Sequence, residues 1–320
     1  MSKIAFVFPG QGSQQVGMGR ALVDAFPYVK ELFDAADEAL GYAISRLCWE
    51  GPEAELVRTQ NTQPALLLCS VAAAEVLHRE LGLRPQLCAG HSLGEYSALV
   101  AAGSLRLTDA LRLVHLRGQF MQEAVPEGVG AMAALIGLDA EAVQKICEQA
   151  GDLAEQCQPA NENGAGQIVI SGHKGAVERA MALAKAGGAK LCKLLQVSAP
   201  FHSALMRPAA ERLRAELAQV EVRLPELTVI ANVDAAPYPQ GNVSADVVRE
   251  RLYQQVAGTV RWENCVKTLV ACGATTAIEV GPGRVLSGLI KRIAPAIAIH
   301  SFADPTGLEA LRGLVVSTGS

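Results

Sequence analysis

The chain has 320 residues, which is the length of about two domains and is sufficient to bury a large core. Half of the residues are apolar, 19% are charged and the formal net charge is −4. This composition is typical of a compact globular protein. Because the charge is negative and no basic tract occurs, nucleic acid is not expected as a partner, and no apolar run is long enough to cross a membrane.

Eight cysteines are spread along the chain without Cys-x-x-Cys spacing. Most lie among apolar neighbours, a setting typical of reduced cysteines in the core of a cytosolic protein. The spacing does not fit a disulfide framework or a zinc site. We therefore expect a cytoplasmic protein that holds no metal.

Strand-like and helix-like segments alternate along most of the chain, which favours an α/β fold with a mostly parallel sheet. The predicted strands of this part cover residues 4–8, 86–89, 227–231, 275–280 and 296–300. The predicted helices cover residues 28–40, 64–81, 93–102, 109–124, 203–219, 245–257, 262–272, 284–293 and 307–316.

The middle of the chain follows a different order. Strands are predicted over 131–136, 153–157, 168–170 and 189–197, with helices over 140–150 and 175–186. This βαββαβ order is that of a ferredoxin-like domain. We therefore expect a small domain over 129–197, inserted into a larger domain made of residues 1–128 and 198–320.

The sequence Gly90-His91-Ser92-Leu93-Gly94 lies where a short apolar strand meets a predicted helix. This is the Gly-x-Ser-x-Gly nucleophile elbow in the strand–turn–helix context that it requires. A sharp turn exposes the serine hydroxyl, and the helix N-terminus offers free N–H groups to a developing oxyanion. An ordinary glycine-bounded turn with a capping serine is the alternative.

A serine nucleophile needs a base, and six histidines are available. His202 and His300 are the candidates, and His202 is favoured because it lies where the chain leaves the predicted small domain, at a junction where clefts form. His91 adjoins Ser92 but is expected to point away from it.

Arg117 is unusual because it falls on the apolar face of the helix predicted over 109–124. A buried guanidinium needs an anionic partner, which would be a distant carboxylate of the chain or a substrate. The glycine-rich loop over 8–19 does not fit a nucleotide-binding motif, since Gln15 stands where Gly-x-Gly-x-x-Gly needs its last glycine. It is better interpreted as a second source of backbone N–H groups for an oxyanion hole.

Six short segments in the same order resemble the signature blocks of the malonyl-CoA:acyl carrier protein transacylase family. They are FPGQGSQ (8–14), GHSLGEY (90–96), GAMAA (130–134), QIVISG (167–172), VSAPFHS (197–203) and EVGPG (279–283). The resemblance covers nearly the whole chain. It implies an α/β-hydrolase-like domain that carries a ferredoxin-like insert, in agreement with the pattern of predicted elements.

The resemblance also implies a set of site residues. Ser92 would be the nucleophile, His202 its base and Arg117 the clamp for the malonyl carboxylate. The backbone N–H groups of Gln11 and Leu93 would form the oxyanion hole. The backbone carbonyl of Gln255 would orient the histidine. Four further residues would contact the substrate: Met132, Asn161, Asn163 and Phe201.

The activity implied is transfer of a malonyl group from malonyl-CoA to the phosphopantetheine thiol of an acyl carrier protein, in support of fatty acid synthesis. Such an enzyme is expected to act as a monomer and to need no cofactor beyond its two thioester substrates. A trans-acting polyketide-synthase acyltransferase would have the same chemistry with another carrier. Two different classes stay open as well: a serine thioesterase or esterase, which shares the nucleophile elbow, and an acyl-binding subunit without activity.

Overall fold

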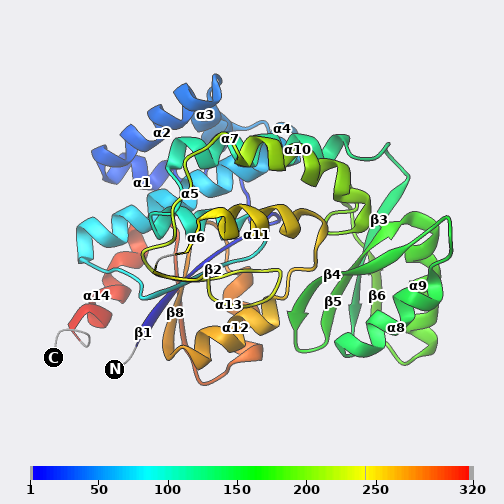
Figure 1. The fold of residues 1–320 in the computed structure, drawn as a ribbon. Helices are drawn as coiled ribbons and strands as arrows, with labels where there is room; N and C mark the ends of the chain where they lie inside the picture. The colour runs from blue at the N-terminus through cyan, green and yellow to red at the C-terminus, as the bar shows by residue number, and fades with distance from the viewer. Residues whose placement is uncertain (1–2, 242, 317–320) are drawn as a thin grey trace.

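The computed structural model describes residues 3–241 and 243–316. It contains two sheets, and Figure 1 shows them side by side, with the smaller sheet at the right of the view. The larger sheet is wholly parallel and has the strand order β7-β2-β1-β8-β9. Its strands are β1 (Lys3–Phe8), β2 (Leu87–Gly90), β7 (Thr228–Ile230), β8 (Ala274–Val280) and β9 (Ala298–Phe302).

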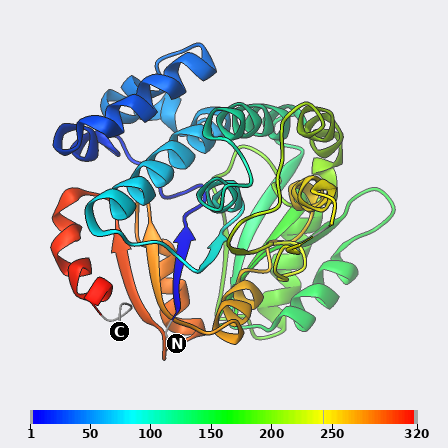
Figure 2. The same ribbon diagram turned by 60° about the vertical axis from the view of Figure 1, so that its left-hand side comes forward.

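Helices cover both faces of the parallel sheet, as expected for strands that are apolar on both sides. Alternate residues of β1 face opposite layers, since Phe6 lies in one apolar cluster and Val7 in the other. Figure 2 shows this sheet between its helical layers. The helices flanking it are α1 (Arg20–Ala25), α2 (Pro27–Leu40), α3 (Ile44–Glu50), α4 (Glu53–Leu56), α5 (Thr59–Leu81), α6 (Gly94–Ala101), α7 (Leu107–Glu123), α10 (Arg207–Leu217), α11 (Asp246–Ala257), α12 (Trp262–Ala271), α13 (Val285–Ile293) and α14 (Leu308–Val316), with short 3₁₀ turns η1 (Ala204–Met206) and η2 (Pro305–Gly307).

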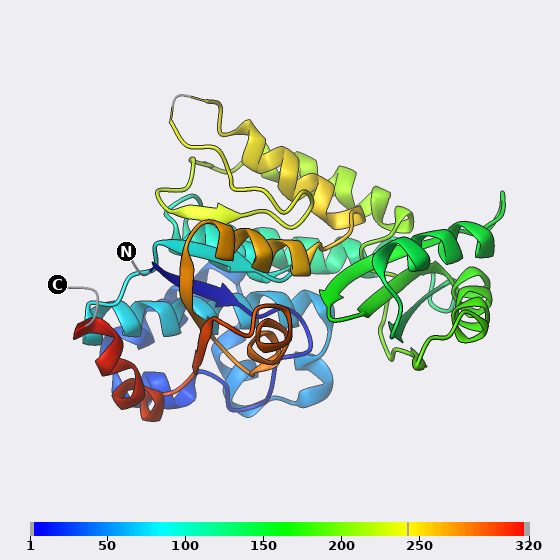
Figure 3. The same cartoon turned by 90° about the horizontal axis from the view of Figure 1, so that it is seen from below.

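The smaller sheet is antiparallel and has the strand order β4-β5-β3-β6. Its elements follow the chain as β3 (Gly130–Ile136), α8 (Ala140–Ala150), β4 (Cys157–Gly164), β5 (Gln167–His173), α9 (Lys174–Ala186) and β6 (Leu191–Leu194). Both helices pack on one face and enclose a separate apolar cluster. Figure 3 shows this unit at the end of the molecule opposite α14. The structure is therefore a mixed α/β fold with a parallel and an antiparallel sheet.

The predicted strand over 153–157 is wrong in position. Leu153 lies in an exposed bend, and β4 instead begins at Cys157. The sequence of β4 is CQPANENG, which is polar and carries a proline, so it lacks the apolar alternation that predicts strands. Asn161 and Asn163 are nevertheless buried, because they face the rest of the molecule rather than water. The predicted strand over 189–197 shortens to Leu191–Leu194, and α1, α3 and α4 were not predicted.

Candidate active site

Ser92 lies in the tight turn between β2 and α6, and its φ of 52° is in the left-handed region. Only glycine fits on either side of this turn. A Cβ at Gly90 would overlap the Gly94 carbonyl, and a Cβ at Gly94 would overlap the carbonyl of Phe8 on the neighbouring strand β1. The Gly-x-Ser-x-Gly pattern is therefore explained by close backbone packing beneath an exposed hydroxyl, as in a nucleophile elbow.

The Ser92 hydroxyl lies 2.7 Å from His202 Nε2. On the other side of the ring, Nδ1 lies 2.9 Å from the Gln255 carbonyl oxygen and 3.1 Å from that of Gly258. Carbonyl oxygens can only accept, so Nδ1 carries the hydrogen and Nε2 is the free acceptor. Burial, together with the nearby Arg117 charge, lowers the pKa of His202 to about 3. The imidazole is therefore neutral and oriented to take a proton from Ser92.

Arg117 projects from α7 to the same hydroxyl and is buried, with 2% of its surface exposed. Its Nη1 donates to Gln63 Oε1 at 2.7 Å, and its Nη2 donates to Ser92 Oγ at 3.1 Å and to Gln255 Oε1 at 3.0 Å. Nε has no hydrogen-bond partner, and no carboxylate of residues 3–241 or 243–316 forms an ion pair with this guanidinium. A buried cation whose partners are two amide oxygens, a hydroxyl and, at 5.7 Å, the Tyr96 ring is incompletely compensated and can bind an anion strongly.

A hydrogen-bonded network lies beneath the nucleophile turn and was not found in the sequence. Asn232 Oδ1 accepts the Ser92 N–H at 2.7 Å, and its amide donates to the Gly90 carbonyl at 2.7 Å. The buried Glu95 carboxyl accepts from Tyr238 at 2.5 Å and from the Gln255 amide at 2.6 Å. Burial raises the pKa of Glu95 to about 7. The one signal in the sequence was an acidic residue, Glu95, in the first turn of an otherwise apolar helix.

Ser92 opens into a cavity of about 170 Å³ between the parallel sheet and the smaller sheet. Seven of the sequence-predicted site residues line it: Gln11, Ser92, Arg117, Met132, Asn161, Phe201 and His202. Gln255, Leu93 and Asn163 lie outside the lining. Asn163 Oδ1 accepts a hydrogen bond at 2.9 Å from Nε2 of His91, whose ring packs against Trp262. His300, the second candidate base, lies on β9 and does not line this cavity.

The backbone N–H groups of Gln11 and Leu93 make no hydrogen bond within the described parts of the chain. Gln11 follows β1, and Leu93 precedes the first turn of α6. They are the amides that the resemblance implies for an oxyanion hole.

Across residues 3–241 and 243–316, the structure has no group of three or more His, Cys, Asp or Glu side chains able to hold a metal ion. Nor does any helix in these ranges have the length and hydropathy needed to span a membrane.

Comparison with known proteins identifies the family. Residues 5–295 match the model of the acyl transferase domain. The malonyl CoA-acyl carrier protein transacylase of Escherichia coli K12 is 48% identical over 310 residues, which are 97% of this chain and 99% of that protein. This chain belongs to the malonyl CoA-acyl carrier protein transacylase family. The acyltransferase is equally similar, at 48% identity, to the Bacillus subtilis 168 transacylase, with 97% of this chain and 96% of that protein covered.

Solved structures agree with this assignment. An acyl carrier protein S-malonyltransferase from Vibrio cholerae superposes on the acyltransferase with a TM-score of 0.92 at 47% identity, covering 97% of this chain and all of the other. A malonyl-transacylase solved in complex with a type II PKS acyl-carrier protein has a TM-score of 0.93 at 46% identity, covering 98% of this chain and all of the other.

Proposed function

We propose that the acyltransferase moves a malonyl group from malonyl-CoA to the phosphopantetheine thiol of an acyl carrier protein through a malonyl-Ser92 ester. The observation that supports this most is the position of the Ser92 hydroxyl, between a neutral histidine nitrogen at 2.7 Å and a buried guanidinium at 3.1 Å. A base on one side activates the nucleophile. An uncompensated cation on the other side selects an acyl group that ends in a carboxylate.

In the first half-reaction, Ser92 Oγ attacks the thioester carbonyl of malonyl-CoA while His202 Nε2 takes its proton. The oxyanion is held by the N–H groups of Gln11 and Leu93. The C–S bond then breaks, His202 returns the proton to the leaving sulfur, and coenzyme A departs. The second half-reaction is the reverse with another thiol: the carrier's sulfur attacks the ester as His202 takes its proton, and Ser92 regains a proton as it leaves.

The remaining residues act on the geometry of these steps. The Gln255 carbonyl keeps Nδ1 protonated, so the dyad works without an acid in contact with the histidine. Arg117 binds the free carboxylate with the guanidinium edge that faces the cavity. We further propose that Met132, Asn161 and Phe201 contact the acyl group from the cavity wall, and that Asn163 lies toward the coenzyme A side. The proposed steps use only these groups and the two thioesters, so no cofactor is required.

Mass spectrometry of the intact protein tests the proposal directly. Incubation with malonyl-CoA should add one malonyl group to the wild type and none to Ser92→Ala, and subsequent holo-acyl carrier protein should remove it and become malonylated itself. Steady release of free malonate in place of transfer would make the protein a thioesterase. Absence of any adduct would make it an acyl-binding subunit.

A polyketide carrier is a second candidate acceptor, because a malonyl-transacylase of similar structure was solved with a type II PKS acyl-carrier protein. The acylation step is the same for both carriers. Comparison of kcat/KM for a fatty-acid carrier and a polyketide carrier, with malonyl-CoA saturating, distinguishes them. We propose the fatty-acid carrier as the physiological acceptor, and a higher kcat/KM for the polyketide carrier would reverse that assignment.

We propose that the carrier docks on a basic patch formed by Arg284, Lys291 and Arg292. All three are exposed, at the start and in the last turn of α13. Arg292 also donates to Gln167 Oε1 on β5 at 3.1 Å, so the patch lies where α13 meets the smaller sheet. Since the enzyme has a net charge of −4 and such carriers are acidic, approach needs a local positive field.

Charge reversal at two of these positions tests the patch. Lys291→Glu combined with Arg292→Glu should raise KM for the carrier and leave acylation by malonyl-CoA unchanged, and added salt should raise the wild-type KM in the same direction. Lys190→Glu with Lys193→Glu, on the exposed edge of the smaller sheet, is the matched control. If the control pair raises KM and the α13 pair does not, the docking surface is the edge of the smaller sheet.

For the architecture, we propose a catalytic domain of the α/β-hydrolase type over 1–128 and 198–320, with a ferredoxin-like domain over 129–197. The βαββαβ order and the strand order β4-β5-β3-β6 support the second part.

We also propose a monomer, because Ser92, His202 and Arg117 meet within one chain. A cytoplasmic location is proposed because all eight cysteines are free thiols. Light scattering and cell fractionation test the last two.

A further inference from the structure

The imidazole of His202 is held between two backbone segments that lie far apart in the sequence. One is its own turn, residues 201–204, which runs into η1 and is called the histidine turn below. The other is the α11 end, residues 255–258, where the carbonyl oxygens of Gln255 and Gly258 lie 2.9 and 3.1 Å from Nδ1. The direction of the ring therefore depends on how the histidine turn and the α11 end are placed relative to each other.

The backbone of the histidine turn has a conformation that it does not favour. The φ angle of His202 is 56°, in the left-handed region, which a residue with a Cβ keeps only when the surrounding structure holds it there. Within this part of the chain, the Ser203 hydroxyl donates to the Pro200 carbonyl oxygen at 2.7 Å. Further support comes from contacts that reach the turn from outside.

Gln158, on strand β4 of the smaller sheet, hydrogen-bonds to both segments. Its Oε1 accepts the Ala204 N–H at 3.0 Å, and its Nε2 donates to the His202 carbonyl oxygen at 3.3 Å. The same Nε2 donates to the Ala257 carbonyl oxygen at 3.2 Å. A primary amide has two hydrogens and an acceptor oxygen, so it can make all three bonds together. Gln158 therefore bridges the histidine turn and the α11 end.

Strand β4 is itself fixed to the chain that follows the α11 end. The Ala160 carbonyl oxygen accepts the Val260 N–H at 2.8 Å, and the Val260 carbonyl oxygen accepts the Glu162 N–H at 2.9 Å. The Thr259 hydroxyl also donates to the Pro159 carbonyl oxygen at 2.7 Å. Because of these bonds, β4 is a fixed support from which a side chain can hold the histidine turn.

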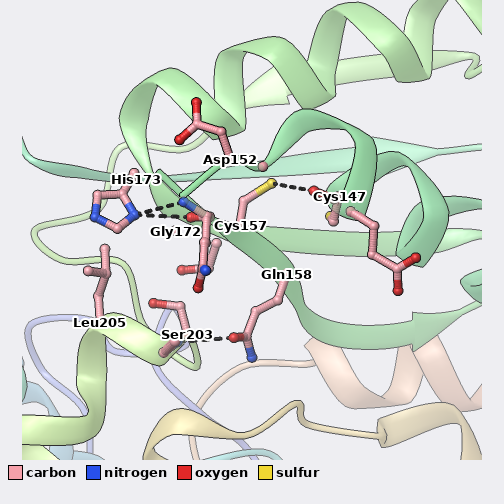
Figure 4. A pocket seen from close by; sticks show the side chains of 13 residues that line it. Cys147, Asp152, Cys157, Gln158, Gly172, His173, Ser203 and Leu205 are labelled. Atoms are coloured by element: carbon pink, nitrogen blue, oxygen red, sulfur yellow. Dashed lines mark hydrogen bonds between the residues drawn. The ribbon is translucent and has the colours of Figure 1, made fainter. Parts of the chain in front are cut away.

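A cavity of about 340 Å³ lies between the smaller sheet and the histidine turn, and Gln158, Ser203 and Ala204 are among the residues that line it. Figure 4 shows the Gln158 side chain directed from β4 to the segment of Ser203. Because the turn borders a cavity on this side, the bonds of Gln158 are not backed by close packing across that space. Their loss would leave the turn free to shift.

We propose that Gln158 is a positioning residue for His202. Its bridge sets the separation at which Nδ1–H meets the carbonyl oxygens of the α11 end while Nε2 stays 2.7 Å from Ser92 Oγ. Gln158 does not line the Ser92 cavity, so it acts on the reaction through His202 and not by contact with substrate. The inference rests on the proposed function in one respect, namely that His202 is the base.

Gln158→Met tests the bridge, because it keeps the length of the side chain and removes all three hydrogen bonds. A displacement of about 1 Å at a reacting group can cost up to 100-fold in rate. The rate of malonyl-Ser92 formation, divided by the final amount of acyl-enzyme, should therefore fall by roughly 10- to 100-fold. The malonyl-CoA concentration for half the maximal rate should stay the same. Transfer to the carrier should fall by the same factor, since His202 serves both half-reactions.

The opposite results overturn the positioning role. An unchanged rate per acylated site means that the contacts of Gln158 are merely structural. A changed half-saturating concentration, or a fall in only one half-reaction, makes Gln158 a substrate contact. Gln158→Asn covers the case in which Gln158→Met does not fold: it keeps the amide but is one methylene too short for the bridge, so it should be slow as well, and a wild-type rate overturns the proposal.

Gln86→Met is the matched control. Gln86 also joins backbone segments through its amide, since its Oε1 accepts the Ile4 N–H at 2.8 Å and its Nε2 donates to the Arg84 carbonyl oxygen at 3.2 Å. It precedes β2, however, at the opposite end of that strand from Ser92. Gln86→Met should lower the free energy of unfolding in urea and leave the acylation rate unchanged. An equal fall in rate would mean general loosening of the fold and would overturn the specific role of Gln158.

A double-mutant cycle shows whether Gln158 acts through the base. In a His202→Ala background, Gln158→Met should have no further effect, because the ring that it positions is gone, and an additional fall equal to that in the wild-type background overturns the proposal.

A readout without malonyl-CoA separates this inference from the proposed function. An alkyl fluorophosphonate attacks activated serines, and its rate of reaction with Ser92 should fall in Gln158→Met by a factor similar to that for acylation. Normal reactivity in Gln158→Met overturns the positioning role. The expected fall in a protein that forms no malonyl adduct supports the positioning role and overturns the proposed function instead.

Discussion

Replacement of Arg117 by methionine gives the sharpest test of the site, because a substrate clamp and a structural cation predict opposite results. Methionine keeps the length of the aliphatic stem and removes the guanidinium. In the free enzyme the lost contacts are those to Gln63, Gln255, the Ser92 hydroxyl and the Tyr96 ring, none of which is charged. The stability of the variant and its choice of substrate can be measured separately.

The magnitudes follow from these contacts. A bidentate charge-assisted pair with a carboxylate contributes roughly 1.5–3 kcal/mol, so kcat/KM for malonyl-CoA should fall by roughly 10- to 150-fold. Acetyl-CoA has no carboxylate to lose and should not fall. The free energy of unfolding should change by less than about 2 kcal/mol, because removal of the buried charge of Arg117 offsets the lost hydrogen bonds.

The assay is acylation of Ser92 measured with both donors, and the informative quantity is the malonyl-to-acetyl ratio. The ratio cancels any change in the reactivity of Ser92 that is common to both donors. Urea unfolding supplies the second quantity. An equal fall for both donors, or a loss of about 3–5 kcal/mol as expected when one partner of a buried ion pair is removed, would refute the assignment of Arg117 as the carboxylate clamp.

Three further predictions concern the same site. Ser92→Ala should abolish the acyl-enzyme, and His202→Ala should slow its formation by about 10²–10⁴-fold in intact-mass kinetics; near-normal transfer in the latter would exclude His202 as the base. Malonyl-CoA should be preferred to methylmalonyl-CoA by roughly 10–200-fold in competition assays, because Phe201 and Leu93 are large neighbours of the reacting groups, and equal rates would contradict this. The pKa of Glu95 is raised to about 7, so between about pH 4.5 and 7 the native state holds a proton that the unfolded state has lost. The protonated carboxyl therefore contributes about 3 kcal/mol to the free energy of unfolding below pH 4.5, and this contribution is lost as pH rises through 7. Glu95→Gln should remove this fall in stability from the pH dependence of urea unfolding, and an unchanged pH dependence would assign it to different groups.

Local patterns were sufficient to predict much of this fold. The parallel strands are short apolar runs, and most helices of the larger part begin and end within a few residues of their predicted limits. The nucleophile turn could be predicted because its glycines are required by backbone contacts between adjacent segments, which leave a signature within five residues. Strand β4 could not, since its side chains are polar and are buried only by residues far away in the sequence.

The residues of the site also differ in how far the sequence alone could predict them. Ser92 and Arg117 stand out in the sequence because each contradicts its surroundings, one as a hydroxyl between glycines and the other as a cation on an apolar face. The position of His202 along the chain only suggested that it lies near Ser92. The tertiary structure is what brings Ser92, His202 and Arg117 together. The support given by Asn232 to Ser92 could not be predicted at all, because it joins residues 140 positions apart and an asparagine after a short strand has no distinctive pattern.

The geometry also links substrate choice to activation of the base. The Arg117 charge is, after burial, the main cause of the low pKa of His202. A malonyl carboxylate bound to that guanidinium neutralises the charge, and the pKa of His202 must then rise toward the range in which it accepts a proton efficiently. An acyl group without a carboxylate leaves the charge in place and meets a weaker base. The same reasoning explains why Arg117→Met should not impair acetyl transfer: removal of the guanidinium raises the pKa of His202 for every donor. Selection of malonyl therefore depends on two effects of one buried cation, a direct ion pair with the substrate and control of proton transfer at Ser92.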